Sequence, residues 1–101
     1  MTEQEHDETI APELAKIAEK MAANGESFIA YSTFENGKSF TRTHKHADDI
    51  DGYSAHEKMI IFMVACSGNF DKFMFSCMKA HKSGEIDFSE SIFAHKLGFG
   101  D

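Results

Sequence analysis

The sequence predicts an α+β fold: an N-terminal helix, one β-hairpin at about residues 27–46, and two to three further helices, including a buried apolar helix at 55–66. Three observations lead to this prediction. Apolar residues recur at helical spacing near the N-terminus. Asn36-Gly37 separates two strand-like runs, and an unbroken apolar stretch runs from Met59 to Cys66. We expect one compact domain over residues 9–98, preceded by a disordered acidic tail at residues 1–8.

The first helix is expected to begin near Thr9, because Pro12 is tolerated in a first helical turn. Asn24-Gly25 is a typical left-handed helix end and should stop it there. Between these limits the apolar residues fall on one stripe of the helix, as expected for a helix that packs on one side. They are Ile10, Leu14, Ile17 and Met21.

The hairpin prediction depends on Asn36-Gly37, because a type I′ turn needs two residues that tolerate positive φ. This turn pairs Glu35 with Lys38, and the register continues outward to Ile29 opposite His44. A lone hairpin is marginal in water, so this one must pack on helices or pair with another chain. Side chains alternate along each strand, which gives one face the following residues: Ile29, Tyr31, Thr33, Phe40, Arg42 and His44.

The second half of the chain carries helix signals at regular intervals. Ser54 and Glu57 form a capping box ahead of the apolar helix at 55–66, which should be buried on all sides. Residues 67–69 (Ser-Gly-Asn) interrupt the pattern, and residues 70–82 resume it, so the stretch 55–82 is one kinked helix or two. Asp87 and Glu90 predict the start of a short last helix that ends near Gly98.

Charge and cysteine content exclude several classes of protein. The formal net charge of −7 disfavours binding to nucleic acid, although residues 27–46 carry +2. The most apolar stretch, residues 59–80, contains charged side chains and is not a transmembrane span. Cys66 and Cys77 lie in apolar surroundings and are read as reduced core thiols, which predicts a cytoplasmic protein.

The histidines offer the main alternative interpretation. His44 and His46 fall on the same side of a strand. A third ligand for zinc would come from His56 or from an aspartate among Asp48, Asp49 and Asp51. The competing interpretation is that His44 and His46 are the solvated end of an edge strand. Six histidines in the chain also leave pH sensing open. A calcium loop around Gly52 fails, because Ala47 and Lys58 occupy the two key acidic positions.

No catalytic constellation accompanies these residues, so we expect a protein that is not an enzyme and has no cofactor. The expected function is a small acidic interaction module, a regulator or inhibitor that binds a protein partner by surface contact and forms a homodimer. Compact regulators, including phage-encoded inhibitors, share such an arrangement of elements. The alternative binding surface is an acidic face of a helix, and the expected one lies on the hairpin: Tyr31, Phe40, Arg42 and His44.

Overall fold

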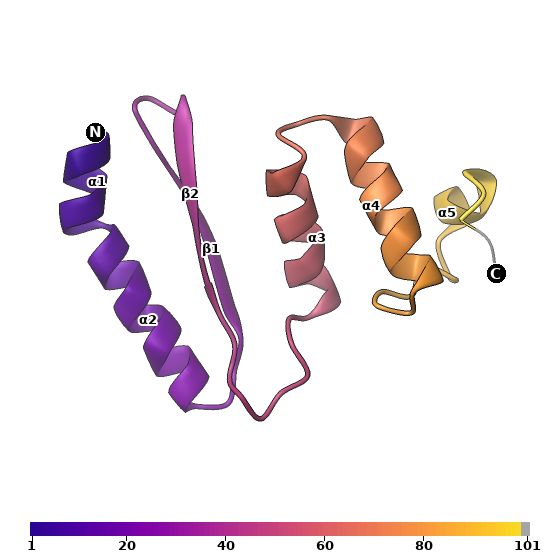
Figure 1. The fold of residues 1–101 in the computed structure, drawn as a ribbon, viewed down its shortest axis with the longest axis horizontal. Coiled ribbons are helices and arrows are strands. Elements are labelled where there is room, and N and C mark those ends of the chain that lie inside the picture. Colours follow the sequence, from indigo (N-terminus) through magenta and orange to yellow (C-terminus); the bar gives the residue numbers. More distant parts are fainter. Residues whose placement is uncertain (100–101) are drawn as a thin grey trace. The chain divides into compact units, whose positions relative to one another are not determined.

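The computed structural model describes residues 1–99 and confirms the α+β class (Figure 1). The chain divides into two units, Met1–Ser54 and Ala55–Asp101, whereas the sequence predicts a single domain over 9–98. Each unit has buried side chains of its own, and each is described separately below. In chain order the elements are α1 (Glu3–Thr9), α2 (Ala11–Ala23), β1 (Phe28–Phe34), β2 (Ser39–Lys45), α3 (Ala55–Ala65), α4 (Phe70–Lys82) and α5 (Ile92–Lys96).

Helix α1 occupies the segment for which the sequence analysis expects a disordered tail. Its start is fixed by a capping box: the Thr2 hydroxyl accepts from the Glu5 backbone N–H, and the Glu5 carboxylate accepts from the Thr2 backbone N–H. These bonds to Thr2 hold the pKa of the Glu5 carboxyl below its usual value. Local capping therefore orders a segment whose acidic composition alone indicates disorder.

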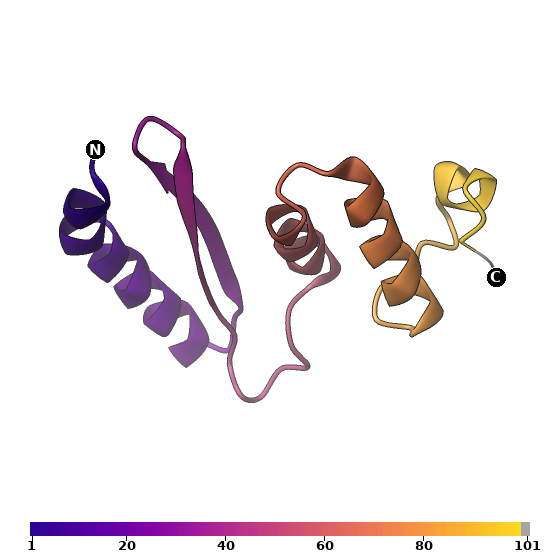
Figure 2. The same ribbon diagram turned by 45° about the horizontal axis from the view of Figure 1, so that its top comes forward.

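Helix α2 packs across both strands of the hairpin, with Ala18 buried in the contact (Figure 2). Pro12 lies in its first turn, as predicted. The helix ends at Asn24, and Gly25 takes a φ of 77° while its N–H donates to the carbonyl of Ala22. The predicted left-handed termination is therefore confirmed, and it turns the chain back so that β1 runs alongside the helix.

The hairpin has the predicted register, with Ile29 opposite His44 and Thr33 opposite Phe40. The N–H of Lys38 donates to the carbonyl of Glu35, which closes the turn around Asn36-Gly37. Glu35 also adopts a positive φ, 55°, and its N–H donates to the carbonyl of Met1 over 2.7 Å. The N-terminal residue is thus hydrogen-bonded to the hairpin turn.

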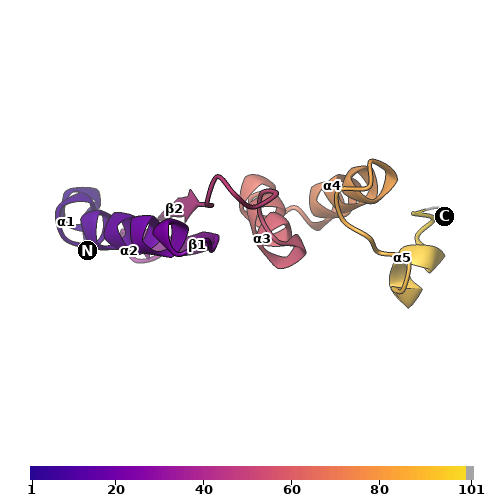
Figure 3. The same ribbon diagram turned by 90° about the horizontal axis from the view of Figure 1, so that it is seen from below.

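In the second unit α3 and α4 are separate helices that pack against each other (Figure 3). The turn between them includes Ser67 and Gly68, with φ values of 50° and 80°, so the stretch 55–82 is two helices instead of one kinked helix. Cys77 of α4, Ala94 of α5 and Phe99 form the buried centre of this unit. Partly buried aromatic and methionine side chains surround that centre: Phe62, Phe73, Met74, Met78 and Phe88.

The prediction that the helix at 55–66 is buried on all sides is wrong for the single chain. Among the described residues, none of α3 is buried, and Met63 is half exposed. Apolar composition around the whole circumference of a helix indicates burial only when neighbours are available on every side. Within this unit α4 packs along α3, and one neighbouring helix covers only part of its surface.

The last helix begins later than the sequence predicts. The Ser91 hydroxyl accepts from the Ala94 N–H and caps α5, while Asp87 instead accepts from the Ser89 N–H in a tight turn. That bond lowers the pKa of the Asp87 carboxyl. Within residues 1–99, none of the helices has both the length and the apolar character needed to cross a bilayer.

Candidate interaction surface

The two faces of the hairpin have different neighbours. On one face His6 of α1 contacts Ser32, and the ammonium group of Lys45 lies 2.7 Å from the Glu19 carboxylate of α2. Because side chains alternate along a strand, Tyr31 and Phe40 point to the opposite face. Helices α1 and α2 therefore pack on one side of the hairpin, which we call the covered face. The residues of the predicted interaction surface lie on the opposite side, which we call the uncovered face because neither of these helices packs on it.

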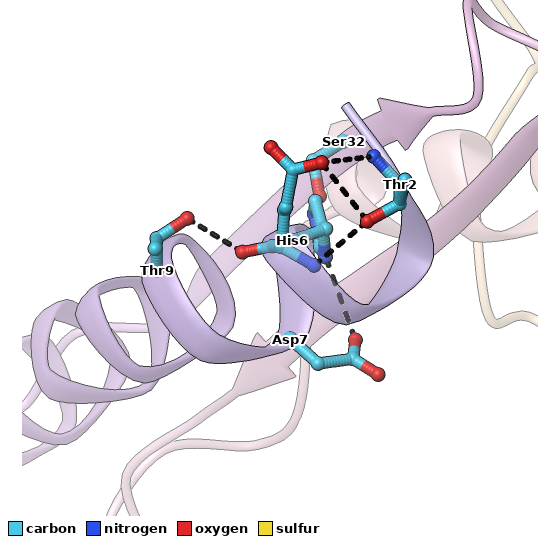
Figure 4. A network of polar contacts seen from close by, with 6 residues as sticks. Thr2, His6, Asp7, Thr9 and Ser32 are labelled. Atoms are coloured by element: carbon cyan, nitrogen blue, oxygen red, sulfur yellow. Dashed lines mark hydrogen bonds and ion pairs between the residues drawn. The ribbon is translucent and has the colours of Figure 1, made fainter.

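His6 holds α1 against the covered face (Figure 4). Its side chain is 1% exposed, its Nε2 lies 2.8 Å from the Ser32 hydroxyl, and its ring lies 4.9 Å from that of Phe34. Its Nδ1 lies 3.7 Å from the Asp7 carboxylate and has no hydrogen-bond partner among the described residues. The sequence pattern did not single out His6, although Thr2-x-x-Glu5 is itself a capping-box signal for α1.

Tyr31 and Phe40 form a stacked aromatic pair on the uncovered face. Their ring centroids are 5.3 Å apart with an interplanar angle of 26°, and the two residues are 50% and 45% exposed. Stacking of neighbouring aromatic rings fixes their orientation before any partner arrives. Large, preorganised and half-exposed aromatic side chains are the type of residue that dominates binding energy at protein interfaces.

Arg42 lies opposite Tyr31 in the register and is half buried. Among the described residues its guanidinium forms no ion pair with a carboxylate. Lys45, in contrast, already has Glu19 as its partner. The uncovered face therefore combines an aromatic pair with a guanidinium that has no ion-pair partner among residues 1–99 and can donate two N–H bonds to a carboxylate.

His44 and His46 both lie against Tyr53, a residue that no sequence motif marks. The Tyr53 hydroxyl is 2.7 Å from His44 Nδ1, and the rings of His44 and His46 make edge contacts to the Tyr53 ring at 5.6 and 4.9 Å. Tyr53 follows the hairpin in the connecting segment, so its contact with the strand end depends on the path of that segment. The alternation of side chains along a strand therefore gives no indication of the contact between Tyr53 and the two histidines.

The histidine geometry bears on the zinc alternative. His46 Nδ1 lies 3.0 Å from the Ala47 carbonyl oxygen, and His56 belongs to the first turn of α3 in the other unit. Among the residues that the structure describes, no group of three or more His, Cys, Asp or Glu side chains is arranged to hold a metal ion. Zinc binding by His44, His46 and His56 stays a prediction that elemental analysis of untagged protein would test.

The two thiols differ in their surroundings. Cys77 is buried, and this burial raises the pKa of its thiol, with a smaller contribution from Cys66 nearby. Cys66 is only half buried, at the end of α3. A thiol with a raised pKa is a weaker nucleophile at neutral pH, so Cys77 is suited to packing rather than to chemistry.

Comparison with known proteins identifies no relative: no family model, curated protein or solved structure matches this chain. Function must therefore be inferred from the uncovered face of the hairpin and the charges around it.

Proposed function

We propose that this chain is a small protein-interaction module that acts as a regulator or inhibitor, and as a homodimer, by covering a surface of a protein partner. The binding surface is the uncovered face of the hairpin, centred on Tyr31 and Phe40 with Arg42 and His44 beside them. The observation that carries this proposal is the exposed aromatic stack next to the Arg42 guanidinium, which forms no ion pair within residues 1–99.

The charge distribution supports a protein partner rather than a polyphosphate. The molecule carries −7 overall, yet residues 27–46 carry Glu35 against Lys38, Arg42 and Lys45. A net acidic molecule is repelled by nucleic acid. Lys38 and Arg42, which form no ion pair within residues 1–99 whereas Lys45 pairs with Glu19, would steer the hairpin toward an acidic patch on a protein. The matching partner surface is apolar at its centre, with a carboxylate within reach of Arg42.

Affinity capture from the source cell tests this proposal when wild type is compared with matched variants. The double variant Tyr31→Thr/Phe40→Thr removes the stack and keeps side chains that suit a strand. The control, Ile17→Ala, removes an apolar side chain that is 46% exposed on α2 of the same unit. Circular dichroism establishes that each variant keeps its helix and strand content.

We expect the double variant to lose the captured partner and the control to keep it. With the purified partner, loss of the stack should weaken binding at least about tenfold, the effect of losing one or two hot-spot residues. Arg42→Gln should weaken binding less and reduce its dependence on salt. Equal retention by wild type and by the double variant would rule out the hairpin face as the binding surface.

A further inference from the structure

The second unit exposes large apolar side chains around α4 and α5. Phe70, Phe75 and Leu97 line one groove of about 340 Å³. Phe93 lines a neighbouring groove of about 120 Å³, and Met74 belongs to both. The first groove also includes Asp71 and Met78, and we call it the α4 surface; the second groove is lined by the buried Cys77 instead. The exposed fractions are 67% for Phe70, 62% for Phe75 and 54% for Leu97.

The apolar area of this surface is more than half of what a stable dimer requires. From the fractions left exposed, Phe70, Phe75 and Leu97 present on the order of 300–400 Å² of apolar area. A standard interface buries about 800 Å² per partner, and about 65% of a homodimer interface is apolar, which is roughly 520 Å². A patch of this size is comparable to the largest apolar patch on a typical monomeric protein, which is often functional.

The charge pattern of α4 indicates which molecule could bind the α4 surface. Asp71, Phe75, Met78 and Lys82 follow one another at i, i+4, i+7 and i+11, which places them on a single stripe of the helix. Asp71 and Lys82 are exposed at opposite ends of this stripe, on the side away from buried Cys77. The stripe thus has an acid at one end, a base at the other, and apolar residues between them.

Such a stripe is complementary to itself when two copies run antiparallel. A two-fold axis between positions 76 and 77 pairs Asp71 with Lys82 of the second copy and Phe75 with Met78 of the second copy, each pair occurring twice. A parallel arrangement would instead oppose like charges at both ends. Antiparallel packing also sets each helix dipole against the other.

The charge composition of the second unit favours association between two copies. Residues 55–101 carry six acids and five lysines, so this half of the chain is nearly neutral, whereas residues 1–54 carry eleven acids against five bases. Little net repulsion therefore opposes contact between two copies of the second unit.

We infer that two copies of this chain associate through the α4 surface in an antiparallel α4–α4 contact, with Asp71 and Lys82 fixing the register. This inference rests on the proposed function in one respect, the homodimer, and it assigns that dimer to a surface separate from the hairpin. The dimer and the binding of another protein can therefore fail independently.

Light scattering coupled to size-exclusion chromatography of the full chain, over a range of concentrations, tests the inference. Wild type should reach twice the chain mass of 11.3 kDa. Phe75→Ala should weaken the dimer about tenfold or more, because it removes an aromatic side chain from the centre of the contact. The hairpin variant Tyr31→Thr/Phe40→Thr should dimerise like wild type.

Charge exchange gives the sharper test. Asp71→Lys and Lys82→Asp each oppose like charges twice across the dimer, so each variant alone should dimerise about fivefold more weakly or worse. A 1:1 mixture of the two variants restores both attractive pairs and should associate again. The double variant Asp71→Lys/Lys82→Asp should also recover, although it places both charges unfavourably for the helix dipole.

If Asp71 and Lys82 only stabilised their own helix, the double variant would dimerise more weakly than either single variant. That order, or a wild type that stays at 11.3 kDa at the highest concentration, would overturn the inference. So would a dimer that none of the α4 variants weakens. None of these three outcomes changes the partner binding expected of the hairpin, which the capture experiment measures separately.

Discussion

His6 and Cys77 are both buried, yet burial has different consequences for each side chain. The imidazole of His6 keeps a polar partner, Ser32, and fastens α1 to the hairpin. The thiol of Cys77 lies among apolar side chains, where desolvation raises its pKa. One residue therefore contributes a specific contact between elements, and the other contributes packing.

The raised pKa of the Cys77 thiol leads to a prediction about alkylation. Less thiolate is present at neutral pH when the pKa is raised, and the side chain is shielded from solvent. Cys66 should therefore react with iodoacetamide at least about tenfold faster than Cys77 in the native protein. Peptide mass mapping at timed intervals measures both rates.

Unfolding in denaturant serves as the control, since it removes the shielding and should bring the two rates close together. Native Cys77 reacting as fast as Cys66 would contradict the buried position of its side chain in α4.

The hairpin turn contains a residue whose backbone conformation is unfavourable. Glu35 has a φ of 55°, a region that residues with a Cβ adopt at a cost of roughly 1 kcal/mol. Glu35→Gly should relieve this cost and raise the free energy of unfolding by about 0.5–1 kcal/mol, with part of the gain offset by the greater freedom of glycine in the unfolded chain. Urea denaturation followed by tyrosine fluorescence measures the change.

Lys38→Gly is the matched comparison, because Lys38 lies in the same turn but is not among the residues with positive φ. It should lower stability instead of raising it. Equal effects of the two glycine substitutions would show that the conformation of Glu35 carries no strain.

Elements fixed by local chemistry were predictable from the sequence. Asn36-Gly37 defines the turn, and a turn of known length determines the register of both strands, which the structure confirms. Asn24-Gly25 likewise predicts the end of α2. The partial exposure of α3 was not predictable in the same way, because apolar composition does not say how many neighbours a helix has.

The candidate surface was predictable only in part. Strand alternation shows that Tyr31, Phe40 and Arg42 share a face, but the choice of the face that stays uncovered depends on where α1 and α2 pack. The contact of His6 with Ser32 places α1 on one face of the hairpin, and His6 lies in a segment whose composition indicates disorder. Tyr53 joins His44 and His46 through the fold of a connector that has no periodic signal.

The division of the molecule into two units gives each half its own natural reporter. Both tyrosines of the chain, Tyr31 and Tyr53, belong to the first unit, and both cysteines, Cys66 and Cys77, belong to the second. Tyrosine fluorescence therefore follows the hairpin unit, and thiol reactivity follows the helical unit.

His6→Ala should separate these two signals. The substitution leaves a cavity and removes the partner of Ser32, so it should lower the stability of the first unit by about 2–4 kcal/mol. The midpoint of the tyrosine transition in urea should fall, while the midpoint for exposure of Cys77 stays in place.

Asp7→Asn is the control, because the Asp7 side chain is largely exposed and 3.7 Å from the ring nitrogen, and it should shift the tyrosine midpoint little. A His6→Ala variant in which both midpoints fall together would show that the halves of the chain unfold as one cooperative system.

The stripe on α4 has a consequence for the strength of binding. Two copies joined there would present two Tyr31–Phe40 stacks on one particle, so the complex would be bivalent. Against a symmetric or repeating target whose sites both copies can reach, the second contact forms at an effective concentration in the millimolar range, and avidity exceeds the affinity of one hairpin by about 10²–10⁴. A modest single contact would then hold a multimeric target firmly and release a lone subunit quickly.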